Sequence, residues 1–110
     1  MEDSNKSKGS ELSKPLLKRV TDFMKKKLHS TVNVGDMAST SNMSKFHFAR
    51  SFKKTTGHSP HQYLTTMRLE KAIALLPGEM PLVEIASESG FSDQAHFTRV
   101  FKRHFGVTPA

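Results

Sequence analysis

The sequence predicts an all-α fold of about seven helices, arranged as two similar subdomains that a long helix joins. Three observations lead to this prediction. Apolar residues recur at three- and four-residue spacing, no stretch of useful length alternates as a strand would, and one pattern of about 25 residues occurs twice. The 110 residues suffice for one small body or two very small packed ones, and they are too few for a sizeable enzyme core with a lid.

The N-terminal segment 1–12 is polar and has almost nothing to bury, so we expect a disordered arm or a linker there. From Ser13, which can cap it, a first helix is predicted. Asn33 can cap the next short helix, and Asp36 at its third position can return a hydrogen bond. The apolar positions of the first helix are Leu16, Leu17, Val20, Phe23, Met24 and Leu28. We therefore expect the first subdomain over 13–60.

A second long periodic stretch predicts the joining helix over 61–76, and Pro77 with Gly78 ends it. Its apolar stripe is Leu69, Ala72, Ile73 and Leu76. The second subdomain is then expected over 77–110. Its opening helix has Met80 and Pro81 at the start, so proline at the first turn replaces a side-chain cap.

The strongest signal is an internal repeat, because 36–60 can be aligned with 84–109 after one insertion. Conservative pairs, such as Met37 with Ile85, lie between the identical ones. The identical pairs are Ala38 with Ala86, Ser39 with Ser87, Ser41 with Ser89, Ser44 with Ser92, Phe48 with Phe97, Arg50 with Arg99, Phe52 with Phe101, Lys53 with Lys102, Gly57 with Gly106, and Pro60 with Pro109. The chain therefore carries one structural unit twice.

Each copy meets the requirements of a helix-turn-helix motif. A small residue is needed where the second helix crosses the first, and both copies have alanine there, Ala38 and Ala86. The turn often has positive φ, which Gly90 adopts freely and Asn42 tolerates. The residues expected to cap the second helix and to face its core are Ser44, Phe48 and Phe52 in the first copy, and Ser92, Phe97, Phe101 and Phe105 in the second.

The opposite face of each second helix is left for a partner, and its residue types suit DNA. Arginine can bond bidentately to guanine, glutamine can bond to adenine, and alanine, phenylalanine or threonine can contact a thymine methyl group. The candidate base-reading residues are Phe46, Ala49 and Arg50 in the first copy, and Gln94, Ala95, Thr98 and Arg99 in the second. The candidate phosphate-binding residues are Ser44, Lys45, Lys53, Lys54, Ser92, Lys102 and Arg103.

Other interpretations of these residues stay open. Arg50 and Arg99 can be solvated charges or can pair within the fold, and Phe46 can be partly buried instead of exposed to DNA. The run of three lysines at 25–27 is more typical of a solvated face than of a contact.

The charge balance favours a polyanionic partner. Lysine and arginine number 17 against 10 acidic residues, which gives a formal net charge of +7, as expected for a protein that binds nucleic acid or an acidic membrane surface. A membrane-binding helix should expose an apolar stripe beside its lysines, whereas the phenylalanines here are phased for burial. The alternative function is therefore a basic helical module that binds a protein or membrane surface without specific DNA binding.

The sequence gives no support for a disulfide-bonded, membrane-spanning, metal-binding or catalytic protein. No cysteine is present, which excludes disulfides and thiolate metal sites and makes the cytoplasm the expected location. No apolar run suits a transmembrane helix or a signal peptide, so we expect no membrane partner. The histidine pairs His58 with His61 and His96 with His104 have no convincing third ligand. No catalytic set occurs, so we expect no enzyme, metal or cofactor.

At these residues the sequence resembles the DNA-binding domain of the AraC family of bacterial transcription regulators. The similar stretches are ASTSNMSKFHFARSFKKTTGHSPHQYL at 38–64, MRLEKAIALL at 67–76 and EIASESGFSDQAHFTRVFKRHFGVTPA at 84–110. The resemblance covers about 14–110 and implies two helix-turn-helix subdomains that place two recognition helices in adjacent major grooves of double-stranded DNA. It also implies that the base-reading candidates named above occupy the reading positions.

The resemblance further implies a sequence-specific regulator that activates transcription and contacts RNA polymerase. A monomer should suffice to reach two major grooves. Successive major-groove faces are about 34 Å apart, and a joining helix of about 16 residues spans about 24 Å before its flanking turns are added. The two faces differ, since Asp93 stands at the start of the second, so we expect an asymmetric DNA target. The family usually continues beyond Ala110 into a last short helix, so a truncated end is expected. Many members also carry a separate ligand-binding or dimerisation domain, and no segment here could be one, so we expect either a short stand-alone regulator or an excised domain.

Overall fold

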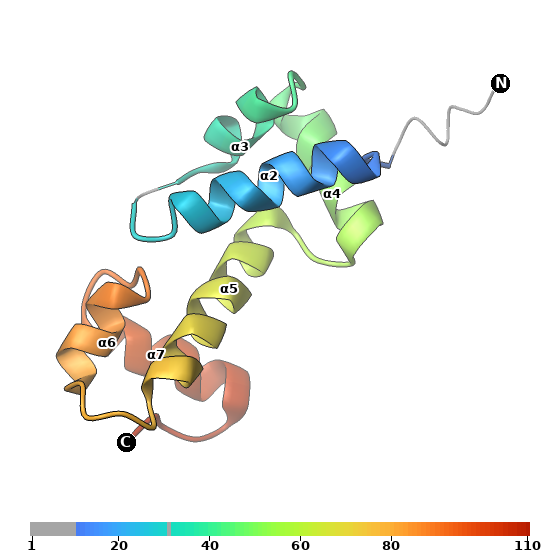
Figure 1. The fold of residues 1–110 in the computed structure, drawn as a ribbon. Coiled ribbons are helices and arrows are strands. Elements are labelled where there is room, and N and C mark those ends of the chain that lie inside the picture. Colours follow the sequence, from blue (N-terminus) through green and yellow to red (C-terminus); the bar gives the residue numbers. More distant parts are fainter. Residues whose placement is uncertain (1–10, 31) are drawn as a thin grey trace, which may run out of the picture. The chain divides into compact units, whose positions relative to one another are not determined.

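The computed structural model describes residues 11–30 and 32–110. This part of the chain contains helices and no strand (Figure 1). The six helices are α2 (Lys14–Lys26), α3 (Val34–Thr40), α4 (Lys45–Thr56), α5 (Pro60–Leu75), α6 (Leu82–Glu88) and α7 (Gln94–Phe105). The predicted all-α class is confirmed, and the number of helices is near the seven expected.

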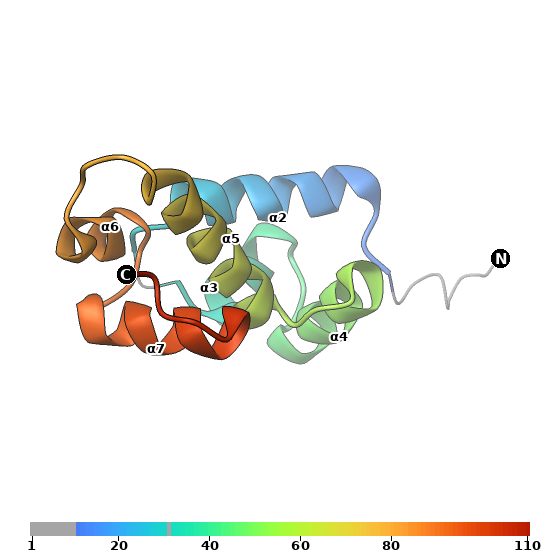
Figure 2. The same ribbon diagram turned by 90° about the horizontal axis from the view of Figure 1, so that it is seen from below.

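The chain divides into two compact units. The first consists of the described residues within 1–27 and 31–64, and the second consists of 28–30 and 65–110. The boundary falls inside α5, so this helix supplies its first residues to one unit and the rest to the other. Each unit holds one pair of short and long helices in the same order, α3 with α4 and α6 with α7 (Figure 2).

Polar side chains cap the helices of the first unit. Ser13 accepts a hydrogen bond from the N–H of Leu16 and so caps α2, as predicted. Asn33 and Asp36 form a reciprocal capping box on α3, with bonds of 2.9 and 3.2 Å. These caps satisfy backbone N–H groups that have no partner within the helix, and the first two predicted helix starts are therefore confirmed.

The start of α5 has a capping box of its own. The N–H of Gln62 donates to the hydroxyl of Ser59, and the side-chain oxygen of Gln62 accepts from the N–H of Ser59, both at 3.2 Å. Pro60 fills the first helical position, where its missing N–H costs nothing. These residues fix the beginning of the long helix close to the predicted position 61.

The core of the first unit forms where its helices meet. Phe48 and Phe52 on α4 are fully buried, and their ring centroids lie 5.5 Å apart. Tyr63 packs edge-on against Phe52 at 5.2 Å. Leu12 is also buried, and its N–H donates to the hydroxyl of Thr55 at 2.9 Å. The packed part thus already includes Leu12, which the sequence places at the end of the expected arm, while residues 1–10 of that arm lie outside the described residues.

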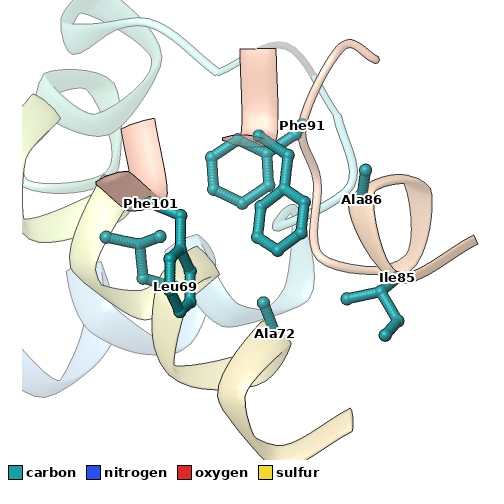
Figure 3. Packing of buried hydrophobic residues seen from close by; sticks show 7 residues of the cluster. Leu69, Ala72, Ile85, Ala86, Phe91 and Phe101 are labelled. Carbon is teal, nitrogen blue, oxygen red and sulfur yellow. The ribbon is translucent and has the colours of Figure 1, made fainter. Parts of the chain in front are cut away.

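The core of the second unit gathers around the aromatic rings of α7 and its preceding turn (Figure 3). Phe97 packs against both Phe91 and Phe101, with centroid distances of 5.1 and 5.7 Å. The buried members are Leu69, Ala72, Ile85, Ala86, Phe91, Phe97 and Phe101. The core therefore joins one face of α5 to α6 and α7.

Two apolar residues of the predicted helical stripes are not buried in this core. Ile73 is 42% exposed, because the packed stripe of α5 follows Leu69 and Ala72 and does not extend around to its neighbour. Phe105 is 41% exposed, although its ring lies 4.6 Å from that of Phe101. It has the predicted phase, but it stands in the last turn of α7 where little chain covers it. The predicted burial of Phe105 was wrong.

Across residues 11–30 and 32–110, no helix has both the length and the apolar character needed to cross a membrane.

Candidate nucleic-acid interface

A tight turn joins α3 to α4 in the first unit. Asn42 adopts positive φ, 59°, and the N–H of Met43 donates back to the carbonyl of Ala38 at 3.2 Å. Ser41, just before, is buried and its hydroxyl also donates to Ala38, at 3.0 Å. Both bonds satisfy the carbonyl of Ala38 near the end of α3, where the chain reverses sharply. The turn is the one that the sequence predicts around Asn42.

The turn between α6 and α7 repeats this backbone geometry. Gly90 has φ of 93°, and the N–H of Phe91 donates to the carbonyl of Ala86 at 2.9 Å. Ala38 and Ala86 are both buried, as expected of small residues where two helices cross. Both units therefore contain a short helix, a positive-φ turn and a longer helix, and the predicted pair of helix-turn-helix motifs is confirmed.

In the first unit, α4 presents a cationic face opposite its buried side. Ser44 caps the helix by accepting from the N–H of His47 at 3.2 Å. Phe46, Arg50 and Lys53 are exposed and lie one above another at spacings of four and three residues. Phe46 is 86% exposed, so the interpretation that buries it partly is wrong. An uncovered phenylalanine thus stands among cations at the start of the helix.

In the second unit, α7 begins differently from the prediction. The cap is Asp93, whose carboxylate accepts from the N–H of His96 at 2.7 Å, and the predicted cap at Ser92 is wrong. The hydroxyl of Ser92 lies 3.2 Å from Nδ1 of His96 instead. Asp and Ser cap helices about equally well, so residue type does not distinguish Ser92 from Asp93. The cap is the residue directly before the first helical residue, and helix boundaries predicted from sequence are uncertain by one or two positions.

The outer face of α7 matches that of α4 position by position. Ala95, Arg99 and Lys102 are exposed at the places that correspond to Phe46, Arg50 and Lys53. Each face therefore carries an arginine at its middle and a lysine one turn further. Of these three positions only the first differs, with a large ring in one unit and a methyl group in the other.

The remaining predicted site residues lie on or beside these two faces. Ala49 and Thr98 are half-buried at the edge of each face. Those exposed are Ser44, Lys45, Lys54, Ser92, Gln94 and Arg103. Every residue assigned to base reading or phosphate binding is thus at least partly accessible, and none lies in either core.

The electrostatics of both faces are positive. Neither α4 nor α7 contains an acidic residue, and basic residues occupy the last turn of each. Within residues 11–30 and 32–110, the one ion pair joins Lys18 to Asp22 on α2. The cations of α4 and α7 are therefore not neutralised by carboxylates in this part of the chain, which suits a polyanionic partner.

Sequence reasoning missed one charged residue near the second turn. Arg68 of α5 donates to two backbone carbonyls, those of Leu28 and Ser30, and lies close to Gly90. Its partners lie 40 and 38 positions away in the chain, so no local pattern indicates them.

Comparison with known proteins identifies the fold. A family model described as a helix-turn-helix domain matches residues 37–110, more than half of the chain. The probable transcription factor PqrA of Proteus vulgaris is 41% identical over 80 residues, which cover 72% of this chain and 66% of PqrA. A solved AraC-type transcriptional regulator from Chromobacterium violaceum superposes with a TM-score of 0.77 at 29% identity, covering 86% of each chain. The chain belongs to the AraC-type family of helix-turn-helix transcription regulators.

A second solved structure of similar fold includes nucleic acid. The DNA-binding domain of AdpA, described as a global transcriptional factor in complex with a target DNA, has a TM-score of 0.79 and 32% identity, and the match covers 88% of this chain and 87% of AdpA's domain. The predicted family is confirmed, and with it the predicted class of function, sequence-specific DNA-binding transcription regulation.

Proposed function

We propose that this AraC-type chain binds its DNA target by seating α4 and α7 in consecutive major grooves. The observation that carries the proposal is the matched pair of outer faces. Each follows a helix-turn-helix turn, each is cationic, and each repeats the same arginine and lysine positions. In this proposal the predicted subdomains 13–60 and 77–110 are the two reading units, and the helix over 61–76 joins them.

The base-reading residues follow from what each side chain can bond. Arg50 and Arg99 can each donate two hydrogen bonds to a guanine, and Gln94 can bond bidentately to an adenine. Apolar contact with thymine methyl groups suits the others. The proposed base readers are Phe46, Ala49 and Arg50 on α4, and Gln94, Ala95, Thr98 and Arg99 on α7.

The phosphate-binding residues flank these readers. Cations in the last turns can reach the sugar-phosphate backbone, and a helix N-terminus presents N–H groups to an anion. The proposed residues are Ser44, Lys45, Lys53 and Lys54 in the first unit, and Ser92, Lys102 and Arg103 in the second. These contacts set register and affinity, and the readers set sequence preference.

We further propose that the chain binds as a monomer and activates transcription through contact with RNA polymerase. One chain already presents two reading helices, so a second copy is not needed to supply them. The family resemblance supports the activating role. We propose that the protein acts in the bacterial cytoplasm. The proposed function requires no enzymatic step and no cofactor.

Selection of bound sites from a random DNA pool tests the base-reading part. The wild type should select an asymmetric site, and Arg50→Ala and Arg99→Ala should each relax preference at a different set of base pairs. Each lost bidentate contact should reduce discrimination by about 1–3 kcal/mol. The matched control is Lys26→Ala, which removes one exposed charge from α2 outside both faces. Should neither arginine variant change the selected sequence, the reading role of these faces is refuted.

A further inference from the structure

Arg68 points into the second unit although it carries a charge. Its Nε donates to the carbonyl of Leu28 at 3.2 Å, and its Nη2 donates to the carbonyl of Ser30 at 3.0 Å. The side chain is half-buried, and this burial lowers the pKa of Arg68 from its ordinary value. Because a buried charge is costly unless it is hydrogen-bonded, the two carbonyls are what make this position tolerable.

The segment that Arg68 holds, 28–30, follows the C-cap of α2 at Lys27 and packs with the second unit. The bond to the carbonyl of Leu28 is partly buried, and a backbone carbonyl removed from water needs a donor, whereas the bond to Ser30 is exposed to solvent. Arginine meets this need with one side chain, because its planar guanidinium presents several N–H groups in a fixed arrangement. A lysine at this position would offer a single ammonium and a less specific geometry.

Gly90 rests directly against this arrangement. A Cβ placed on Gly90 would overlap the carbonyl oxygen of Leu28 and lie 2.8 Å from Nε of Arg68. At the equivalent place in the first unit, Asn42 is exposed and keeps a full side chain. The segment 28–30, which is hydrogen-bonded to Arg68, therefore packs against the second turn. In the first turn, the equivalent Asn42 is exposed to solvent.

We propose that Arg68 is a positioning residue for DNA reading by the second unit. By fixing the carbonyls of Leu28 and Ser30, it supplies the surface on which the turn at Gly90 rests, and this turn sets where α7 begins. Arg68 acts through the turn and not through a base. The proposal rests on the proposed function, because it requires that α7 reads DNA.

The test compares sites selected from a random DNA pool by the full chain and by its Arg68→Met and Arg68→Lys variants. Arg99→Ala first marks the base pairs that α7 reads, and Arg50→Ala marks those that α4 reads. Arg68→Met should reduce discrimination at the α7 base pairs by at least about fivefold, the lower end of what one good base contact contributes. Discrimination at the α4 base pairs should stay unchanged. Arg68→Lys should give an intermediate value at the α7 base pairs.

Arg19→Met is the matched control. Arg19 is exposed on α2, and its Nη1 donates to the carbonyl of Thr40 at 3.4 Å, so the variant also removes one charge and one arginine–carbonyl bond. It should leave the pattern at the α7 base pairs unchanged. Circular dichroism of each variant shows whether the helices persist, and if Arg68→Met fails to fold, Arg68→Lys decides.

Two results would overturn the proposal. Equal loss of discrimination at both sets of base pairs would assign Arg68 a global role in stability. Unchanged discrimination at the α7 base pairs in a folded variant would remove its role altogether. If Arg99→Ala itself leaves the selected site unchanged, the failure lies in the proposed function of α7, and this proposal falls with it.

Discussion

Asn42 and Gly90 occupy the same place in the two helix-turn-helix turns, and both have positive φ, 59° and 93°. The same backbone conformation is thus met by two different residues. Asn42 faces solvent, and asparagine tolerates this region better than most residues. Gly90 has no room for a side chain, because Leu28 and Arg68 occupy the space where its Cβ would lie. The conformation is shared, but the surroundings of the two turns are not.

Gly90→Ala should therefore destabilise the protein far more than an equivalent change at an open turn. The left-handed conformation alone costs an alanine about 1–2 kcal/mol, and overlap with a backbone carbonyl adds about 1–3 kcal/mol. Gly106→Ala is the matched control, since its φ is 83° and nothing lies within 4 Å of the added Cβ. Urea unfolding followed by circular dichroism measures both. Equal losses of unfolding free energy would contradict the packing that we describe at Gly90.

Phe46 gives a prediction about DNA chemistry. Its ring is 86% exposed among cations, and the thymine methyl is an apolar group that the major groove offers. The base pair in question is the one at which Phe46→Ala relaxes sequence preference. Replacing its thymine by deoxyuridine should weaken binding about fourfold, because one methyl group removed from water contributes about 0.8 kcal/mol.

The matched comparison uses the Phe46→Ala variant itself. It should bind the thymine and deoxyuridine duplexes with nearly equal affinity, because the side chain that detects the methyl is gone. An identical response to deoxyuridine in wild type and variant, measured by fluorescence anisotropy, would show that Phe46 does not detect the methyl.

Local signals made much of the fold predictable. Ser13, Ser44 and the pair Asn33 with Asp36 each act on backbone groups within a few residues, so their capping roles can be read from sequence. The turn at Gly90 is equally local, because the residue type itself permits positive φ. The repeat then transfers the turn from one unit to the other, but not the helix cap, because Asp93 and not Ser92 caps α7.

Features that depend on distant chain could not be predicted in this way. Periodicity gives the direction of Phe105 correctly, but burial also needs chain to pack over it, and that is missing at the end of α7. Arg68 resembles any helix-surface arginine until Leu28 and Ser30 are brought beside it. The identity of the base-reading residues stays a prediction, since exposure shows which side chains can reach DNA and not which bases they contact.

Asp93 combines two roles that substitution can separate. Its carboxylate caps α7 through the N–H of His96, but it also places a negative charge at the end of a helix that we propose enters DNA. Asp93→Asn keeps a good cap, so unfolding free energy should change little, and removal of the charge should tighten DNA binding at low salt. Asp93→Ala should lose about 1 kcal/mol of stability. Weaker binding by a fully folded Asp93→Asn would argue against a nearby phosphate backbone.

Salt dependence tests the phosphate contacts as a group. Binding that neutralises phosphates releases counterions, so the logarithm of affinity should fall linearly with the logarithm of salt concentration between about 50 and 200 mM. Lys53→Ala and Lys102→Ala should each weaken binding on all sequences and reduce the slope by about one. Lys26→Ala, on α2, removes the same charge outside both faces and should leave the slope nearly unchanged. If Lys26→Ala lowers the slope as much as Lys53→Ala does, then net charge alone, and not the outer faces of α4 and α7, governs binding.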